Sequence, residues 1–197
     1  MDQSNVLDME FIWRGWRGTL TDPNHPSQPA YKIDLTLANT MEFETADGRV
    51  FGSSRVKFVS INPSFTVHSH RGTLQAMKRL ATKYNYFSYA RAQEINSDSP
   101  VPMIWTSSFA FKTWQFTCLD ENLLPVARVK ANVWALKALG TIEFLGDSMS
   151  QDLREEIIVT GITLYLCMGY IISSPLSLLG AAVSKTGPIE QPPAVQS

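Results

Sequence analysis

A long uncharged run near the C-terminus limits most strongly what this chain can fold into. Residues 157–172 read IIVTGITLYLCMGYII, sixteen residues without a charge. Before this run, Asp152 and Glu155 are spaced as an N-cap residue and its reciprocal partner, and acidic side chains suit the positive end of a helix dipole. Pro175 cannot continue a helix. The pattern predicts one apolar helix over about residues 152–172.

The region before this helix has the pattern of many short β-strands. Residues 31–37 alternate apolar and polar side chains, which indicates a half-buried strand. Asp47-Gly48 separates two alternating runs and is a typical hairpin turn. Five further strand candidates follow before the helix, at 104–111, 113–119, 126–131, 133–139 and 141–145. Strands in such close order favour a mainly β sandwich or barrel, which a helix of about 30 Å could thread from end to end.

A membrane span is the competing interpretation of the apolar run. Uncharged sequence continues from residue 157 to residue 184, which is long enough to cross a bilayer. However, the strongly apolar part has sixteen residues, fewer than the roughly 20 that a spanning helix needs. No cluster of Lys or Arg flanks it as an orientation signal. The pattern favours a core helix, with a tail anchor over 157–184 as the alternative.

The features between Thr113 and Leu166 resemble those of a known superfamily. The segment reads TWQFTCLDENLLPVARVKANVWALKALGTIEFLGD, then LREEIIVTGITLYL: a Trp-x-Phe-x-Cys strand, an Asp turn, and a strand that ends shortly before the apolar helix. This order resembles the tubby C-terminal-like superfamily, which includes fungal tubby-like proteins, plant LURP-one-related proteins and phospholipid scramblases. The resemblance is specific only from about Thr113 to Ile172. It implies a closed antiparallel barrel of about twelve strands around a buried apolar C-terminal helix.

Together these patterns predict one domain with short tails. We expect a flexible N-terminus over residues 1–10, a tubby-like barrel domain over 11–180, and a disordered, Pro-rich tail over 181–197. The two cysteines, Cys118 and Cys167, are too few for a disulfide framework and are expected to be buried free thiols. The N-terminus has no signal-peptide pattern, so we expect an intracellular, cytoplasmic protein. We also expect a monomer.

Positive charge is concentrated in one block of an otherwise acidic chain. Residues 49–93 contain eight Lys or Arg and no Asp or Glu, whereas the remainder has nine basic and eighteen acidic residues. Such asymmetry creates a local field that attracts anionic partners, although charges spread around a barrel would simply solvate it. Residues 73–83 have apolar side chains at helical spacing, which predicts a short basic amphipathic helix. The candidate anion- or lipid-binding residues are Arg55, Lys57, Arg71, Lys78, Arg79 and Lys83.

Catalytic and metal-binding patterns are incomplete. Gly146-Asp147-Ser148 resembles the serine block of GDSL-type esterases, but all three histidines precede it, whereas those enzymes have their histidine base downstream. His68 and His70 would share one face of a strand, a spacing that can bind zinc, yet no Cys or carboxylate lies near them in sequence. We therefore expect no enzyme activity, no catalytic residue, no metal and no cofactor.

The function that these observations favour is a non-enzymatic binding domain. Tubby domains bind phosphoinositides through basic surface residues, so the resemblance implies docking on phosphoinositides or anionic membrane surfaces, although no residue can be carried over by position. A tail-anchored membrane protein and a protein-interaction scaffold without lipid binding are the alternatives. The Trp- and Arg-rich segment 13–18 could stack on bases, but a strand with inward tryptophans explains it equally well, and we expect no nucleic-acid partner.

Overall fold

The structure of the chain is a computed structural model. It describes residues 4–12, 17–36, 39–57, 60–77, 83–110, 113–132, 137–146, 149–173 and 185–189.

Thirteen strands and two helices make up the described part of the chain. In order they are β1 (Val6–Ile12), β2 (Arg17–Thr21), β3 (Pro29–Thr36), β4 (Thr40–Thr45), β5 (Val50–Lys57), β6 (Ser60–Val67), β7 (His70–Thr73), β8 (Gln75–Ala76), β9 (Lys83–Ser88), α1 (Tyr89–Glu94), β10 (Val101–Ala110), β11 (Thr113–Leu119), β12 (Pro125–Asn132), β13 (Lys137–Phe144) and α2 (Gln151–Ser173).

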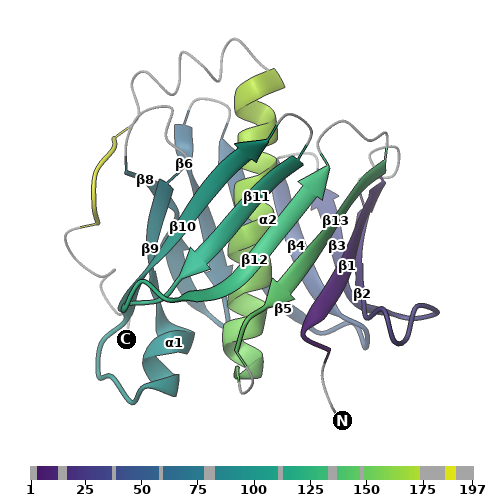
Figure 1. The fold of residues 1–197 in the computed structure, drawn as a ribbon, viewed down its shortest axis with the longest axis horizontal. Helices are drawn as coiled ribbons and strands as arrows, with labels where there is room; N and C mark the ends of the chain where they lie inside the picture. Colours follow the sequence, from purple (N-terminus) through teal and green to yellow (C-terminus); the bar gives the residue numbers. More distant parts are fainter. Residues whose placement is uncertain are drawn as a thin grey trace.

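The strands form one antiparallel sheet that curls into a nearly closed barrel (Figure 1). Neighbouring strands are neighbours in sequence, except that β1 pairs with β13 and joins the two ends of the strand series. The two edge strands of the sheet are β7 and β8, and the chain that joins them is hydrogen-bonded to the start of β6. There Leu74 donates its backbone N–H to the carbonyl of Pro63, and Ala76 donates to Oδ1 of Asn62, both at 2.9 Å. The predicted mainly β barrel around a C-terminal helix is confirmed, with thirteen strands where about twelve were expected.

Helix α2 runs through the barrel and packs against β5, β6, β11 and β12 (Figure 1). Residues 153–167 are all buried. Gly161 lets the wall approach closely, since a Cβ there would lie 3.1 Å from the Trp105 ring. The same Trp105 donates its indole N–H to the Thr160 hydroxyl at 3.2 Å. This packing matches the helix predicted over 152–172.

The burial of α2 also bears on the alternative of a tail anchor over 157–184. Residues 157–167 lie inside the barrel, in contact with strands rather than with a surrounding medium. Among the described residues, none of the helices combines the length and apolarity that crossing a bilayer requires.

Two described segments near the chain ends, residues 6–10 and 185–189, differ from expectation. The flexible segment predicted over residues 1–10 contains most of β1, which pairs with β13 from Val6 onward. Within the tail predicted to be disordered, residues 185–189 lie against the barrel. Gly187 donates its N–H to the carbonyl of Ala76 at 3.0 Å and accepts from the Gln75 amide at 2.8 Å. Asn62 donates to the carbonyl of Lys185 at 2.7 Å. These bonds hold residues 185–189 because they satisfy polar groups at the seam between β6 and β8.

Removal of residues 185–197 should therefore destabilise the barrel. Four hydrogen bonds made by the described residues 185–189 would be lost, each contributing about 0.5–1.5 kcal/mol, less the entropy of ordering the segment. We expect the free energy of unfolding in urea to fall by about 2 kcal/mol. Hydrogen exchange should become faster at β8 and unchanged at β12, which is four strands away in the sheet. Equal stability of the truncated and full-length chains would contradict this assignment.

Candidate anion-binding pocket

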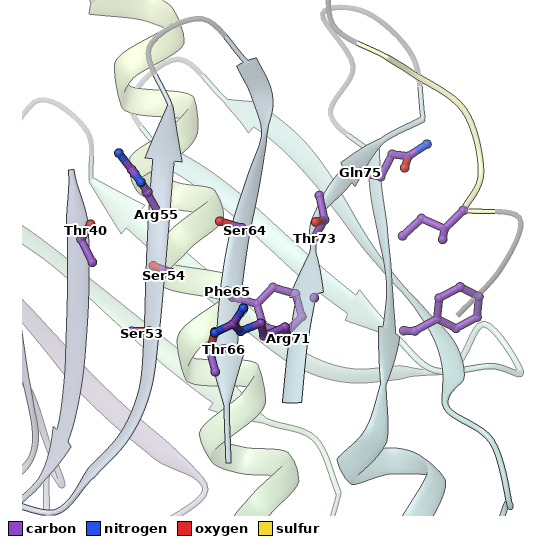
Figure 2. Close-up of a pocket in the computed structure, with 13 residues that line it drawn as sticks. Thr40, Ser53, Ser54, Arg55, Ser64, Phe65, Thr66, Arg71, Thr73 and Gln75 are labelled. Carbon is purple, nitrogen blue, oxygen red and sulfur yellow. The ribbon is translucent and has the colours of Figure 1, made fainter. Parts of the chain in front are cut away.

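A pocket of about 850 Å³ opens on the outer face of β4 to β7 (Figure 2). Its walls are rich in hydroxyl groups and contain two arginines. The lining residues are Thr40, Ser53, Ser54, Arg55, Ser64, Phe65, Thr66, Arg71, Gly72, Thr73, Gln75, Phe87 and Ile189.

The register of the strands brings the polar side chains of the pocket together. Side chains two apart on a strand share a face, and residues paired across strands lie side by side. One row consists of Thr40, Arg55, Ser64 and Thr73, each paired with the next. The adjacent row consists of Ser53, Thr66 and Arg71. The two arginines therefore belong to neighbouring rows, with the hydroxyls of β6 between their strands (Figure 2).

Both arginines are exposed and keep their charge available. Among the described residues, neither Arg55 nor Arg71 forms an ion pair, whereas Arg17, Arg49, Arg91 and Arg128 all do. No described lining residue is acidic. Glu42 pairs with Ser53 on the β4 side but does not line the pocket. A guanidinium presents five donors in a planar fork that matches phosphate oxygens, so the pocket is chemically suited to an oxyanion.

The tight turn between β6 and β7 fixes the register that places Arg71. His68 and Ser69 form a two-residue turn with φ values of 46° and 73°, the geometry of a type I′ hairpin. Side chains other than glycine adopt such values at a cost. Contacts at the tip offset it: His68 donates its N–H to the carbonyl of Phe51 at 3.1 Å, and the His70 ring stacks on Tyr89 at 4.2 Å.

Gly72 and the C-terminal segment shape the pocket floor and rim. A Cβ at Gly72 would lie 2.3 Å from the Phe65 ring, so the glycine is required for that ring to cover β7. Ile189 forms part of the wall. Once the Asn85 amide is oriented to satisfy its neighbours, that amide accepts from the Ile189 N–H at 2.8 Å and donates to the carbonyl of Gln75 at 2.9 Å.

The predicted basic residues are only partly brought together. Arg55 and Arg71 line the pocket. Lys57 is exposed two residues beyond Arg55, and Lys83 is exposed at the start of β9, and neither lines the pocket. Lys78 and Arg79 lie outside the described residues.

The prediction of a basic amphipathic helix over 73–83 is wrong for the described residues of that segment, 73–77 and 83. Thr73 ends β7, β8 follows, and Lys83 begins β9, with the Met77 N–H bonded to the Lys83 carbonyl across a hairpin. The physical reason lies in a short pattern. Leu74 and Ala76 are both fully buried, two residues apart, which is the period of a strand. The hydroxyl residues of the pocket were missed, although Ser64 and Thr66 are two apart on one strand and Ser53 and Arg55 are two apart on another, the spacing of side chains that share a face.

The remaining sequence candidates separate in space or lie elsewhere. His70 stacks on Tyr89 while His68 points from the turn toward α2, so the two imidazoles do not form one site. Asp147 and Ser148 of the GDSL-like block lie outside the described residues. Cys118 and Cys167 are buried free thiols, as predicted. Burial raises the pKa of Cys167 to about 12 and that of Cys118 well above its usual value, so neither is a reactive thiolate near neutral pH.

Comparisons with known proteins add little to the description above. No protein-family model matches the chain, and no curated protein matches it. Among solved structures, the chain is similar to the X-ray structure of a protein from Arabidopsis thaliana, AT5G01750, with a TM-score of 0.46 and 11% sequence identity over 82% of this chain and 89% of that one. A similarity this loose carries no argument about activity.

Proposed function

We propose that this chain is a non-enzymatic, intracellular binding domain of tubby-like fold that docks reversibly on anionic membrane surfaces. The observation that carries the proposal is the pocket on β4 to β7, where Arg55 and Arg71 stand among hydroxyl groups without an acidic lining residue. The ligand we propose is the phosphorylated headgroup of a phosphoinositide. Its phosphates suit the two guanidinium groups, and its ring hydroxyls suit the side chains of Ser64 and Thr66.

The electrostatics of the pocket favour weak, reversible binding. Each Arg near an anionic leaflet contributes about 1 kcal/mol, and the hydroxyl groups add specificity rather than charge. The pocket lies on the outside of the barrel, so a headgroup could enter without a change in the core. Lys57 is exposed on the same strand as Arg55 and would extend the contact to neighbouring lipids.

Co-sedimentation with vesicles tests this function. We expect binding to phosphatidylcholine vesicles that contain phosphatidylinositol bisphosphate, little binding to phosphatidylcholine alone, and weaker binding as salt rises. The double variant Arg55→Gln/Arg71→Gln should bind about 30-fold more weakly, since two contributions of about 1 kcal/mol are lost.

The matched control is Lys32→Gln/Lys130→Gln, which removes the same charge from exposed positions on β3 and β12. This control should retain most of the binding. If both double variants bind equally well, or if neutral vesicles bind as tightly as anionic ones, the pocket is not a headgroup site.

A protein-interaction scaffold is the second candidate, and one feature favours it. Leu123 and Leu124 are 61% and 60% exposed at the turn between β11 and β12. Leu123 has φ 62°, and the turn is held by Asp120, which accepts from the N–H groups of Asn122 and Leu124. A rigid turn that displays two leucines suits a protein partner. Failure of all vesicles to bind would favour this candidate.

A further inference from the structure

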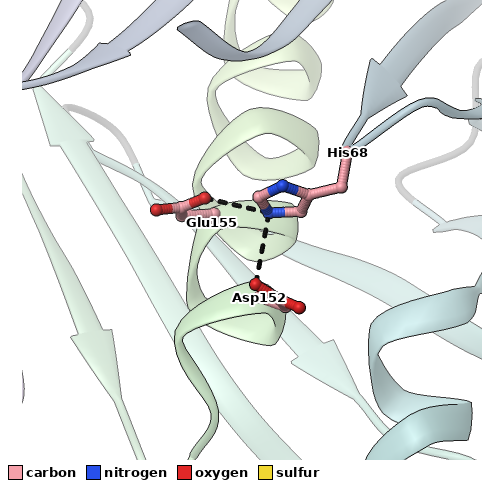
Figure 3. Close-up of side chains that lie close together, drawn as sticks. All are labelled: His68, Asp152 and Glu155. Carbon is pink, nitrogen blue, oxygen red and sulfur yellow. Dashed lines mark ion pairs between the residues drawn. The ribbon is translucent and has the colours of Figure 1, made fainter. Parts of the chain in front are cut away.

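A second group of polar side chains lies at the other end of the β6–β7 hairpin, where it meets the start of α2 (Figure 3). His68 comes from the hairpin turn, and Asp152 and Glu155 come from the first turns of α2. Nε2 of His68 lies 2.9 Å from Oε2 of Glu155 and 3.6 Å from Oδ1 of Asp152. The three potential ligand atoms all lie within 4.8 Å of one another.

The hydrogen bonds of Glu155 leave one of its oxygens aimed at this cluster. The side chain is fully buried. Its Oε1 accepts from the Arg49 guanidinium at 2.8 Å and from the Gln151 amide at 2.7 Å. Its Oε2 accepts no hydrogen bond, and Nε2 of His68, which is also buried, makes none either, despite the short distance between the two atoms. A buried carboxylate oxygen without a hydrogen bond is costly. A cation that accepts one electron pair from Oε2 of Glu155 and one from Nε2 of His68 would therefore stabilise the site.

We propose that His68, Asp152 and Glu155 bind a divalent transition-metal ion through Nε2, Oδ1 and Oε2, respectively. Ligand atoms that each lie about 2.1 Å from a tetrahedral zinc are about 3.4 Å apart, and the separations of 2.9 and 3.6 Å lie on either side of that value. An imidazole with two carboxylates suits zinc and its neighbours better than calcium or magnesium, which prefer oxygen ligands alone.

The charges around the site also suit a dication. Asp152 and Glu155 supply two negative charges, and Arg49 neutralises one of them while occupying only Oε1. A divalent ion is attracted by the single negative charge that remains and would leave the site with a net charge of +1. The Asp152 side chain is 54% exposed, which leaves an open side for water as a further ligand. The positive end of the α2 dipole opposes the ion, so we expect moderate rather than tight affinity.

The bound ion would tie the β6–β7 hairpin to the central helix. Of its ligands, one belongs to the turn and two belong to α2, whereas other contacts at this tip join the His68 N–H to the Phe51 carbonyl of β5 and the His70 ring to Tyr89 of α1. The metal is therefore a structural clamp at this end of the barrel. Neither its presence nor its absence changes the charge of the pocket on the outer face.

Zinc titration of the purified full-length chain tests the site. We expect one zinc ion per chain by calorimetry and, with cobalt as a spectroscopic substitute, visible absorption bands from a site with one nitrogen and several oxygen ligands. The variant His68→Asn removes the imidazole while Asn tolerates the positive φ of the turn. The variant Asp152→Asn changes an exposed ligand. Each should weaken zinc binding by at least about tenfold, the smallest loss typical of even an outer-shell change.

The control is His25→Asn, which removes an imidazole from an exposed loop and should leave zinc affinity unchanged. Circular dichroism checks that each variant is folded. If His68→Asn does not fold, Asp152→Asn still tests the site. Three results would overturn the proposal: no zinc binding at a one-to-one ratio, undiminished binding by the folded Asp152→Asn variant, or an equal loss with His25→Asn, which indicates surface imidazoles alone.

Discussion

Replacing Glu156 with glutamine should remove a loss of stability that the wild-type chain undergoes between about pH 5 and pH 8. Glu156 is almost fully buried, at 3% exposure. Its burial raises the pKa to about 7, even though contacts with Ser88 and the Ala90 N–H lower it. In the unfolded chain the pKa of this glutamate is near its ordinary value of 4.5. The folded state therefore holds a proton over a pH range in which the unfolded state has released it.

The sign of the effect follows from this difference in bound protons. Between pH 4.5 and about 7 the native state binds more protons than the unfolded state, so the free energy of unfolding falls as pH rises. Above about pH 8 both states are deprotonated and the loss is complete. The shift corresponds to about 3 kcal/mol. Glutamine resembles the protonated acid, so Glu156→Gln should match wild type near pH 5 and exceed its stability by about 3 kcal/mol at pH 8.

Urea unfolding of both chains at several pH values provides the measurement. The difference between their free energies of unfolding isolates Glu156, because the other titrating groups are common to both. The control Glu44→Gln makes the same charge change on the half-exposed outer face of β4, and its difference from wild type should stay flat between pH 5 and pH 8. A flat difference for Glu156→Gln as well would mean that the buried carboxyl is ionised throughout.

The neighbouring Glu155 shows why position along one helix decides the outcome. It is as deeply buried as Glu156 but faces Arg49, whose guanidinium lies 2.8 Å away. Glu156 faces the start of α1, and in the described part of the chain it has no cationic partner and its Oε1 makes no hydrogen bond. A counter-ion compensates the first carboxylate, whereas a proton compensates the second.

The sequence predicted the features that rest on long periodic patterns. The apolar run at 157–172 and the serial strands before it specified a helix enclosed by a barrel, because a helix apolar on all sides must be surrounded. The predicted hairpin at Asp47-Gly48 also holds: Gly48 has φ 85° and donates to the Thr45 carbonyl. Both patterns are local, and neither depends on which distant strands meet.

What the sequence could not supply is long-range placement. Arg55 and Arg71 were candidates on charge alone, and only the register of β5, β6 and β7 puts them in one pocket. His68 and Glu155 are far apart in sequence, so no spacing pattern connects them. The tail was predicted to be disordered from its composition, yet its described residues 185–189 are held by Gln75 and Asn62, two side chains on strands far away in sequence. The false helix at 73–83 arose because strands of four and two residues give too few positions for the strand period to outweigh the helical spacing of the apolar residues.

Substituting alanine for Gly140 should destabilise the barrel strongly, because β13 has no room for a side chain at this position. A Cβ there would lie 2.4 Å from the carbonyl oxygen of Lys130 and 2.7 Å from Cε of Met9. The methionine could move, but the carbonyl belongs to the backbone of β12. Relief would require β12 and β13 to separate locally, so we expect a loss of about 3 kcal/mol, at the upper end for overpacking, and a fall of roughly 6–12 °C in Tm.

The position of Gly140 explains why this cost cannot be absorbed locally. It pairs with Met9 on β1 and with Ala131 on β12, and the β1–β13 pairing joins the two halves of the strand series. Thermal and urea unfolding provide the measurement, and Gly146→Ala is the matched control, because a Cβ at Gly146 meets nothing within 4 Å. The control should change stability by no more than about 0.5 kcal/mol. If Gly140→Ala unfolds at the same temperature as Gly146→Ala, β12 and β13 must lie farther apart at this position than the structure places them.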